Sequence, residues 1–264
     1  MGNRTMDPSF DSAAKLYDNE FTFSEIGKLQ RDRVYFWLNK INFFKKPKRV
    51  FEVNCGTGYD AKLFTERGHQ VTATDGSEKM LEVAQKRNPE LDIYQRKFID
   101  ISIDDNIGKS EAVFSNFGGL NCLSEEQLLC FINETAAQQK VGDLLISVIM
   151  PNHCFIADLF HFLTGKFNQI RRRNREEFLE VNVNGESIRT YYHHPATVSK
   201  LLYSNYKVLL KKPIAIFLPP SYTELFFKRN KWALKGLYLL ERIFGNLSFL
   251  SSKADHYIIV AERK

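Results

Sequence analysis

The sequence predicts an α/β fold, a mostly parallel and doubly wound sheet of seven strands with helices on both faces. Three observations predict it. Short apolar runs alternate with helical segments between residues 48 and 150. A tight Gly-x-Gly turn at Gly56 and Gly58 follows the first run, and an acid, Asp75, ends the second. Such alternation is typical of parallel βαβ units, whose strands are buried beneath helices.

Two helices are expected before the sheet, because apolar residues recur with a helical period over residues 11–39. Ser24 is a suitable N-cap for the second helix. The alternating region then predicts strands and helices in turn. The expected strands are 50–54, 70–74, 91–95, 111–116 and 143–149, and the expected helices are 59–67, 77–87 and 124–139.

The alternation breaks after Pro151. A helix is expected over 154–163, and Asn184-Gly185 between two β-like runs, 178–183 and 186–192, indicates a hairpin. A helix (196–204), a strand (206–211), a long helical stretch (222–249) and a last strand (256–262) follow, the two late strands pairing antiparallel.

We therefore expect one domain over 1–264. It divides into N-terminal lid helices (10–45), a cofactor-binding core (48–150) and two substrate-cap insertions, 151–195 and 219–253.

Composition is that of an ordinary globular protein, with 44% hydrophobic and 26% charged residues. Four cysteines are scattered without regular spacing, so neither a disulfide framework nor a metal site is expected. We found no signal-peptide pattern and no apolar run of about 18–20 residues. These features favour a cytoplasmic protein, as a monomer or homodimer. The net charge is −3 over residues 1–150 and +9 over residues 151–264.

The turn could hold two kinds of nucleotide-like ligand. Gly56-x-Gly58-x-x-Ala61, with Asp75 beyond it, fits a dinucleotide fingerprint. Glu52 and Asp60, however, flank the same turn, and carboxylates there would oppose a pyrophosphate at the helix N-terminus. S-adenosylmethionine suits such an acidic turn better, because it carries an ammonium group and ribose hydroxyls and has no phosphate.

At this point the sequence resembles the class I S-adenosylmethionine-dependent methyltransferases, which have a Rossmann-like fold. The resemblance rests on EVNCGTGYD (52–60), VTATDGSEKML (71–81) and AVFSNFGGLN (112–121). It covers residues 10–150 well and the later elements more loosely. Asn54 stands where many members have Gly, which is tolerable if the backbone there is extended.

The resemblance implies a set of cofactor contacts. Asp75 would hold the ribose diol, Glu52 would order the turn or reach the ammonium group, and the backbone of Phe98 would meet the adenine. Lys97 stands where members often place an acid near the adenine. The full set expected to bind the cofactor is Tyr17, Glu52, Asn54, Gly56, Thr57, Gly58, Asp60, Asp75, Gly76, Ser77, Met80, Phe98, Asn116 and Phe117.

Methyl transfer is chiefly a matter of positioning, so no fixed catalytic constellation is required. His153 follows the fifth strand and is the candidate base, whereas Asp255-His256 is expected to be structural if it begins the last strand far from the cleft. Four residues are candidates to line the substrate pocket: Asn121, Asp158, Tyr192 and Tyr222. The aromatic cap favours a small hydrophobic or aromatic substrate, methylated on oxygen or nitrogen.

Four other interpretations stay open. The basic runs 171–175 and 228–231 could serve an RNA methyltransferase, although no RNA-binding module accompanies them and nucleic acid is not the expected partner. The aromatic and basic stretch 222–249 could contact a membrane surface and admit a lipid-like substrate. An NAD-dependent oxidoreductase and a cofactor-binding protein without activity are the remaining alternatives.

Overall fold

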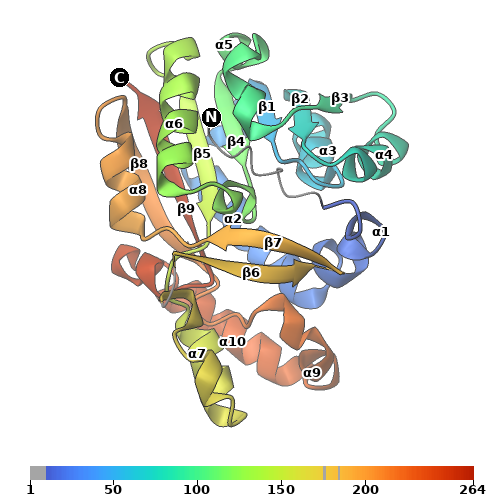
Figure 1. The fold of residues 1–264 in the computed structure, drawn as a ribbon, viewed down its shortest axis with the longest axis vertical. Coiled ribbons are helices and arrows are strands. Elements are labelled where there is room, and N and C mark those ends of the chain that lie inside the picture. The colour runs from blue at the N-terminus through green and yellow to red at the C-terminus, as the bar shows by residue number, and fades with distance from the viewer. Residues whose placement is uncertain (1–9, 175–176, 184) are drawn as a thin grey trace, which may run out of the picture.

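The computed structural model describes residues 10–174, 177–183 and 185–264. Its central element is a seven-stranded sheet in the order β3-β2-β1-β4-β5-β9-β8 (Figure 1). The strands are β1 (Arg49–Val53), β2 (Gln70–Asp75), β3 (Asp92–Gln95), β4 (Ala112–Ser115), β5 (Leu144–Ile149), β8 (Tyr206–Ile214) and β9 (His256–Arg263). β9 runs antiparallel to β5 and to β8, whereas β1 to β5 pair in parallel. The predicted fold class is confirmed.

Helices cover both faces of this sheet, so successive strand residues enter two separate cores. Ile258 and Val260 of β9 pack into one core with Trp37 and Leu234, whereas Tyr257 and Ile259 pack into the other with Phe131. The helices of the first core include α2 (Glu25–Lys40), α3 (Tyr59–Glu66) and α10 (Lys231–Phe244), and those of the second include α6 (Glu125–Gln138) and α8 (Pro195–Leu202). Burial of both strand faces explains their nearly continuous apolar sequences.

The N-terminal helices form as expected, with one unpredicted irregularity. Ser24 caps α2, its hydroxyl accepting the N–H of Gly27. Before it, α1 (Ala14–Tyr17) continues directly into a π-helical turn, Asp18–Thr22. Such turns are uncommon and occur frequently at functional sites. α4 (Glu78–Arg87) begins at its own cap, Ser77, close to this segment.

The segment between β3 and β4 was not assigned a structure from sequence. It contains a 3₁₀ turn, Phe98–Ile103, and a short helix, α5 (Asn106–Lys109). Asp104 orders it by accepting hydrogen bonds from Tyr94 and Arg96.

The cap consists of α7 (Phe155–Leu163) and a hairpin of β6 (Phe178–Val183) and β7 (Glu186–Tyr191). The hairpin is confirmed, although Asn184 of its predicted turn lies outside the described residues. The hairpin crosses the ends of β4 and β5 in Figure 1. It is fastened at both ends: His193 N donates to Met150 O at 3.1 Å, and Ser12 Oγ donates to Val183 O at 3.1 Å.

The single helix expected over 222–249 is wrong. The chain forms a 3₁₀ turn (Ser221–Thr223), α9 (Glu224–Arg229), α10 and a second 3₁₀ turn (Ser248–Ser252). The break lies at Asn230, which has a non-helical backbone and whose side chain donates to Phe226 O at 2.9 Å. Asparagine side chains compete in this way with the helical hydrogen-bond pattern. None of the helices in the described ranges combines the length and apolarity needed to cross a bilayer.

Candidate active site

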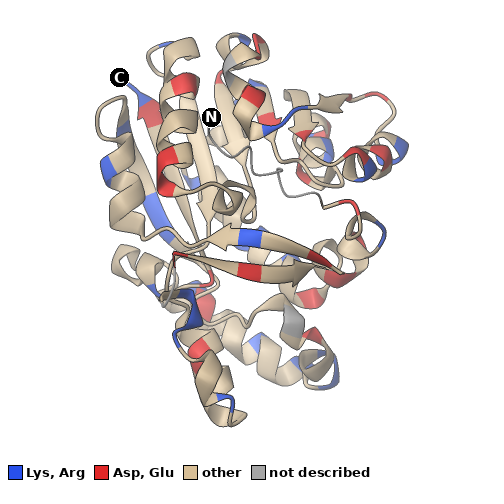
Figure 2. Ribbon diagram, in the orientation of Figure 1, with Lys and Arg blue, Asp and Glu red and all other residues tan. Residues whose placement is uncertain are grey.

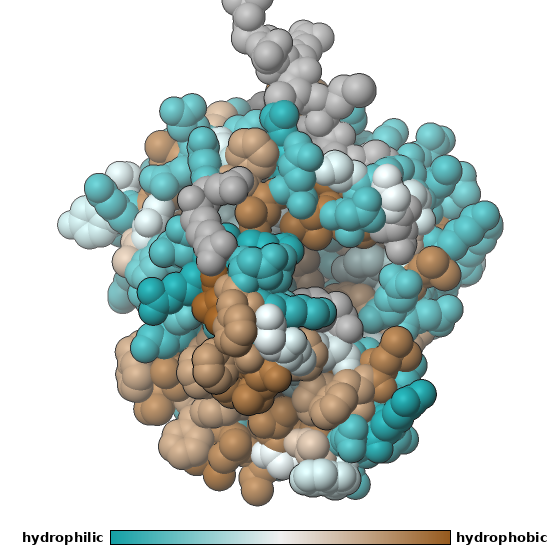
Figure 3. Space-filling model, turned by 60° about the horizontal axis from the view of Figure 1, so that its bottom comes forward, coloured by the Kyte–Doolittle hydropathy of each residue, from teal (hydrophilic) through white to brown (hydrophobic). Residues whose placement is uncertain are grey.

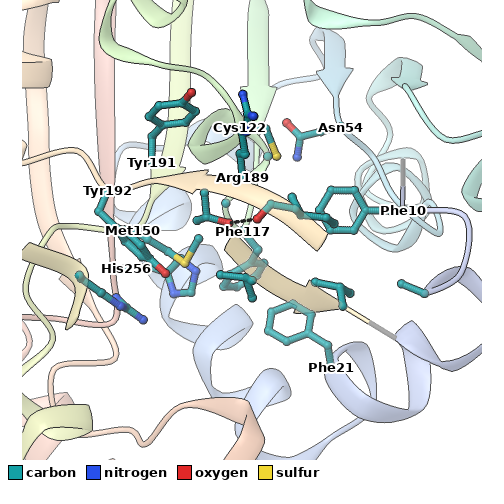
Figure 4. A pocket seen from close by; sticks show the side chains of 18 of the residues that line it. Phe10, Phe21, Asn54, Phe117, Cys122, Met150, Arg189, Tyr191, Tyr192 and His256 are labelled. Atoms are coloured by element: carbon teal, nitrogen blue, oxygen red, sulfur yellow. Dashed lines mark hydrogen bonds between the residues drawn. The ribbon is translucent and has the colours of Figure 1, made fainter. Parts of the chain in front are cut away.

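One large cavity, of about 1330 Å³, lies at the carboxyl ends of the parallel strands. The Gly56 turn, Asp75 and Phe117 form its inner wall, and the N-terminal lid, α7 and the β6–β7 hairpin enclose it. Figure 4 shows Phe117, Met150 and His256 together beside the hairpin, with Asn54 and Cys122 on its far side. Ligands of open α/β sheets bind at this edge, and this volume exceeds that of an ordinary small-ligand pocket.

The turn after β1 requires glycine for two physical reasons. Gly56 and Gly58 have φ angles of 55° and 70°, in the left-handed region that favours glycine. A Cβ on Gly58 would also lie 3.0 Å from the Cβ of Ala84 on α4. Gly58 therefore packs against a helix without lining the cavity, whereas Gly56 faces the cavity.

Asp75 lies at the end of β2 and fixes the same turn. Its Oδ2 accepts Gly56 N at 2.8 Å and its Oδ1 accepts Ser77 N at 2.9 Å. Burial raises the pKa of this carboxyl, and the backbone donors offset that effect only in part. Each oxygen accepts one N–H and keeps a lone pair, so Asp75 can still accept hydroxyl groups from a ligand in the cavity.

Asn54 differs from expectation. Its backbone is not extended but left-handed, with φ 49°, a conformation that asparagine tolerates better than most residues. Its side chain is fixed by Ser115 Oγ, which donates to Oδ1 at 2.6 Å, and by donating to Asn116 O at 2.9 Å. A Cβ on Gly119 would lie 2.1 Å from Asn54 Cγ, so this glycine leaves room for the asparagine.

The acidic rim inferred from Glu52 and Asp60 is not observed. Asp60 is buried in an ion pair with Arg31, at 3.1 Å from Nε to Oδ1, and also accepts hydrogen bonds from Tyr35 and Asn116. Glu52 is buried too, and burial followed by repulsion from Asp60 raises its pKa well above the ordinary value. Neither side chain lines the cavity, because Asp60 is paired with Arg31 of the lid and Glu52 is held in the interior.

The lid contacts the turn through polar and aromatic residues. Thr57 Oγ1 donates to Asp18 Oδ1 at 2.7 Å, and Arg87 bridges both residues, so Thr57 joins the π-helical turn to α4 and does not line the cavity. Tyr17 lines the cavity beside Gly56, and burial raises its pKa to about 12. Tyr17 is therefore a neutral phenol at physiological pH.

The residues expected to border adenine lie partly on the cavity wall and partly in the interior. Gly76, Met80 and Phe98 line the cavity. A Cβ on Gly76 would meet no atom within 4 Å, so the space there is open. Ser77 is buried as the cap of α4, and its hydroxyl donates to Asp11 at 2.5 Å.

Asn116 and Phe117 lie at the end of β4, as expected. Asn116 accepts Phe117 N at 3.0 Å and donates to Asp60. Phe117 has φ 44° and packs edge-on against Phe21, at 5.0 Å between ring centroids, and against His256, at 5.3 Å. The guanidinium of Arg31 lies 5.0 Å from the Phe117 ring.

The substrate side of the cavity contains His153, Asp158 and Tyr192. His153 Nε2 lies 3.0 Å from Asp158 Oδ2, and both side chains are partly exposed. Asn121 is instead structural: it is fully buried and bonds the backbone of Met150 and of Tyr191. The side chain of Tyr222 lies outside the described part of the chain.

Asp255 and His256 lie at the start of β9 and line the cavity, so the start of this strand is not far from the cleft. Both side chains are buried, and His256 Nδ1 lies 3.2 Å from Asp255 Oδ2. Arg173 donates to Asp255 Oδ1 at 2.6 Å. Burial would raise the pKa of Asp255, but the opposing charges of His256 and Arg173 lower it below the ordinary value. β9 is antiparallel to β5, so its first residue, not its last, lies at the active edge.

Sequence reasoning also missed Arg31 and Arg173. Each is far in sequence from the acid that it pairs with, so no local spacing reveals the contact. The antiparallel pairing of the last two strands, which was predicted, could have located His256 at the cavity edge.

Comparisons with known proteins agree with this fold. Residues 50–142 match the family model described as a methyltransferase domain. No significant match to the chain exists among the curated proteins.

Solved structures share the fold at low sequence identity. The magnesium protoporphyrin IX methyltransferase of Synechocystis PCC 6803, with bound SAH, is 15% identical, with a TM-score of 0.59 over 97% of this chain and 94% of that one. PH0226 of Pyrococcus horikoshii OT3 is 14% identical, with a TM-score of 0.56 over 94% and 98%. A SAM-dependent methyltransferase of Archaeoglobus fulgidus is 16% identical, with a TM-score of 0.53 over 95% and 99%.

The matched domain ends just before β5 and contains the Gly56 turn, Asp75 and Asn116, the residues that form the inner wall of the cavity. Residues 50–142 thus match a methyltransferase domain, and the chain has the fold of S-adenosylmethionine-dependent methyltransferases.

Proposed function

We propose that this enzyme methylates an oxygen or nitrogen atom of a small hydrophobic or aromatic molecule. The observation that carries the proposal is the single cavity joining the Gly56 turn to His153 and the cap. The two regions lie on either side of the carboxyl end of β4. Because they belong to one cavity, a cofactor at the turn and an acceptor beneath the hairpin would share one enclosed space.

On the cofactor side, Asp75 would accept the ribose hydroxyls and the open space over Gly76 would receive the adenine. Tyr17, Met80 and Phe117 would provide apolar walls. The sulfonium supplies an electrophilic methyl group, and an aromatic ring beside it can contribute about 0.5–2 kcal/mol of cation–π attraction. Glu52, Thr57, Gly58, Asp60 and Ser77 would act indirectly, by holding the turn, the lid and α4 in place.

On the acceptor side, His153 would remove a proton from the nucleophile. Asp158, at 3.0 Å, would orient its ring and stabilise the imidazolium. Tyr192 and the hairpin would hold the apolar part of the acceptor. His256 is a second candidate base, because it lies on Phe117 at the inner wall and is backed by Asp255.

The test is transfer of a labelled methyl group from S-adenosylmethionine to fractionated small-molecule extracts and, separately, to total RNA. We expect a labelled small apolar product that His153→Gln strongly reduces. Label that enters RNA while every small-molecule fraction stays unlabelled would contradict the proposed substrate class, though not methyl transfer itself.

A further inference from the structure

The outer side of α10 exposes an apolar stripe. Trp232, Leu239 and Ile243 are 79%, 58% and 55% exposed, and their spacing places them on one side of the helix. Leu234 and Glu241, on the opposite side, are buried against the domain. The exposed residues are therefore unnecessary for packing α10 onto the sheet.

Other elements between β5 and β9 add to this exposed apolar surface. α7, the 3₁₀ turn Phe167–Gln169, α9 and the 3₁₀ turn Ser248–Ser252 expose further large apolar side chains: Phe162, Leu163, Phe167, Leu225, Phe226 and Phe249. Figure 3 shows apolar side chains gathered over the lower part of this side of the molecule. We call the exposed apolar residues of α7, α9, α10 and these two turns the docking face. Contiguous apolar surface of this kind marks an interaction site.

The charge on the α9–α10 part of the docking face has one sign. Between residues 224 and 253 the basic residues are all exposed: Lys228, Arg229, Lys231, Lys235, Arg242 and Lys253. The two acids of this segment are buried. Glu224 accepts the N–H groups of Glu25 and Ile26, and Glu241 accepts those of Ala215 and Phe217. Figure 2 shows Lys and Arg along α9 and α10.

We propose that the docking face binds the surface of an anionic membrane. Apolar side chains between exposed cations match the two parts of such a surface, because the rings and aliphatic groups enter the acyl boundary while Lys and Arg meet acidic headgroups. A second copy of the chain is a poorer partner, since a two-fold contact would bring the same cations together.

Docking would place the bilayer beside the cavity. α7 contributes Ala157 and Asp158 to the cavity wall and Phe162 and Leu163 to the docking face. The membrane-facing and cavity-facing sides thus belong to the same short helix.

Vesicle flotation tests the proposal. The purified chain, residues 1–264, is mixed with phosphatidylcholine vesicles, with or without phosphatidylglycerol, at low and at high salt. We expect flotation with the phosphatidylglycerol vesicles at low salt, much less with phosphatidylcholine alone, and weakening as salt rises. Absence of flotation with anionic vesicles at low salt would overturn the proposal.

Two matched pairs of variants locate the contact. The triple change Trp232→Ser/Leu239→Ser/Ile243→Ser is compared with Val141→Ser/Tyr203→Ser, which alters exposed apolar residues outside the docking face. Lys228→Gln/Arg229→Gln/Lys231→Gln is compared with Lys86→Gln/Lys109→Gln/Lys140→Gln. Each docking-face variant should weaken partitioning by about tenfold or more, whereas the controls should not.

Equal binding by docking-face and control variants would exclude this surface as the contact. Light scattering supplies a further readout that does not depend on vesicles: if the wild type is a dimer and the Trp232 triple variant a monomer, the face binds a second copy and the proposal is wrong. Circular dichroism of every variant checks the fold, and the salt dependence of the wild type stands even if a variant fails to fold.

Discussion

Arg31 of the lid helix α2 and Asp60 of α3 form a buried ion pair, with Nε 3.1 Å from Oδ1. The pair joins the N-terminal lid to the helix that follows the Gly56 turn, and Tyr35 and Asn116 complete the hydrogen bonding of the carboxylate. The sequence alone suggested that the carboxylate of Asp60 faces the ligand. In the structure this carboxylate instead holds the lid on the core.

Breaking this pair on one side should be costly. Arg31→Met leaves the Asp60 charge buried without its cation, so the free energy of unfolding should fall by about 3–5 kcal/mol. Urea denaturation measures it. Lys28→Met, which removes an exposed pair with Glu25, should change it by less than about 1 kcal/mol. Adding Asp60→Asn to Arg31→Met should restore part of the loss, and a double variant less stable than Arg31→Met would argue against charge burial as the cause.

Asp75 should be necessary for cofactor binding. Asp75→Asn keeps the size of the side chain but removes the charge that would strengthen its bonds to ribose hydroxyls, so affinity for S-adenosylhomocysteine should fall by about 10- to 100-fold. Isothermal titration calorimetry measures the change. Asp92→Asn, on the exposed end of β3, is the control. Unchanged affinity in Asp75→Asn would place the ribose elsewhere.

Glu52 should make stability depend on pH. Because its pKa is raised in the folded protein, folding favours the protonated form, and this contribution is lost as pH rises from the ordinary pKa through the folded one. Glu52→Gln cannot ionise, so its stability relative to wild type should increase with pH by at most about 1.4 kcal/mol per pH unit. Urea unfolding between pH 5 and about pH 8 measures the difference. If the stability of Glu52→Gln relative to wild type falls as pH rises, the carboxylate is instead stabilised in the fold.

His153 should affect turnover and not cofactor affinity. If it removes a proton from the acceptor, His153→Gln should lower kcat by about 100- to 10,000-fold and leave the Kd of S-adenosylhomocysteine unchanged. His194→Asn, a change at an exposed histidine that caps α8, is the control. A normal kcat in His153→Gln together with a large loss in His256→Gln would transfer the role of base to His256.

Local patterns were enough to predict most of the fold. The Gly56 turn, the alternating elements and the Asn184-Gly185 hairpin each depend on residues close together in sequence. The long helix over 222–249 failed because its apolar pattern continues across Asn230, while the break arises from one side chain bonding to the backbone of Phe226.

The site was less predictable, because its electrostatics depend on distant partners. Asp60 is neutralised by a residue 29 positions earlier, and Asp255 is paired with Arg173, 82 positions away. The sequence predicts which acids and histidines lie near the site, but not the arginines that pair with the acids. The prediction of S-adenosylmethionine was therefore right, but it was argued from Glu52 and Asp60, which do not line the cavity. The acid that does face the turn is Asp75, whose Oδ2 already accepts Gly56 N.

The central claim is that the turn binds S-adenosylmethionine and not a dinucleotide. In support, Asp75 already accepts the Gly56 N–H, which is then not available to a pyrophosphate at this helix N-terminus. The most direct measurement is calorimetric titration of the wild-type protein with S-adenosylhomocysteine and, separately, with NAD⁺. We predict saturable binding of S-adenosylhomocysteine at one site and no heat from NAD⁺. Tight binding of NAD⁺ with none of S-adenosylhomocysteine would contradict the account.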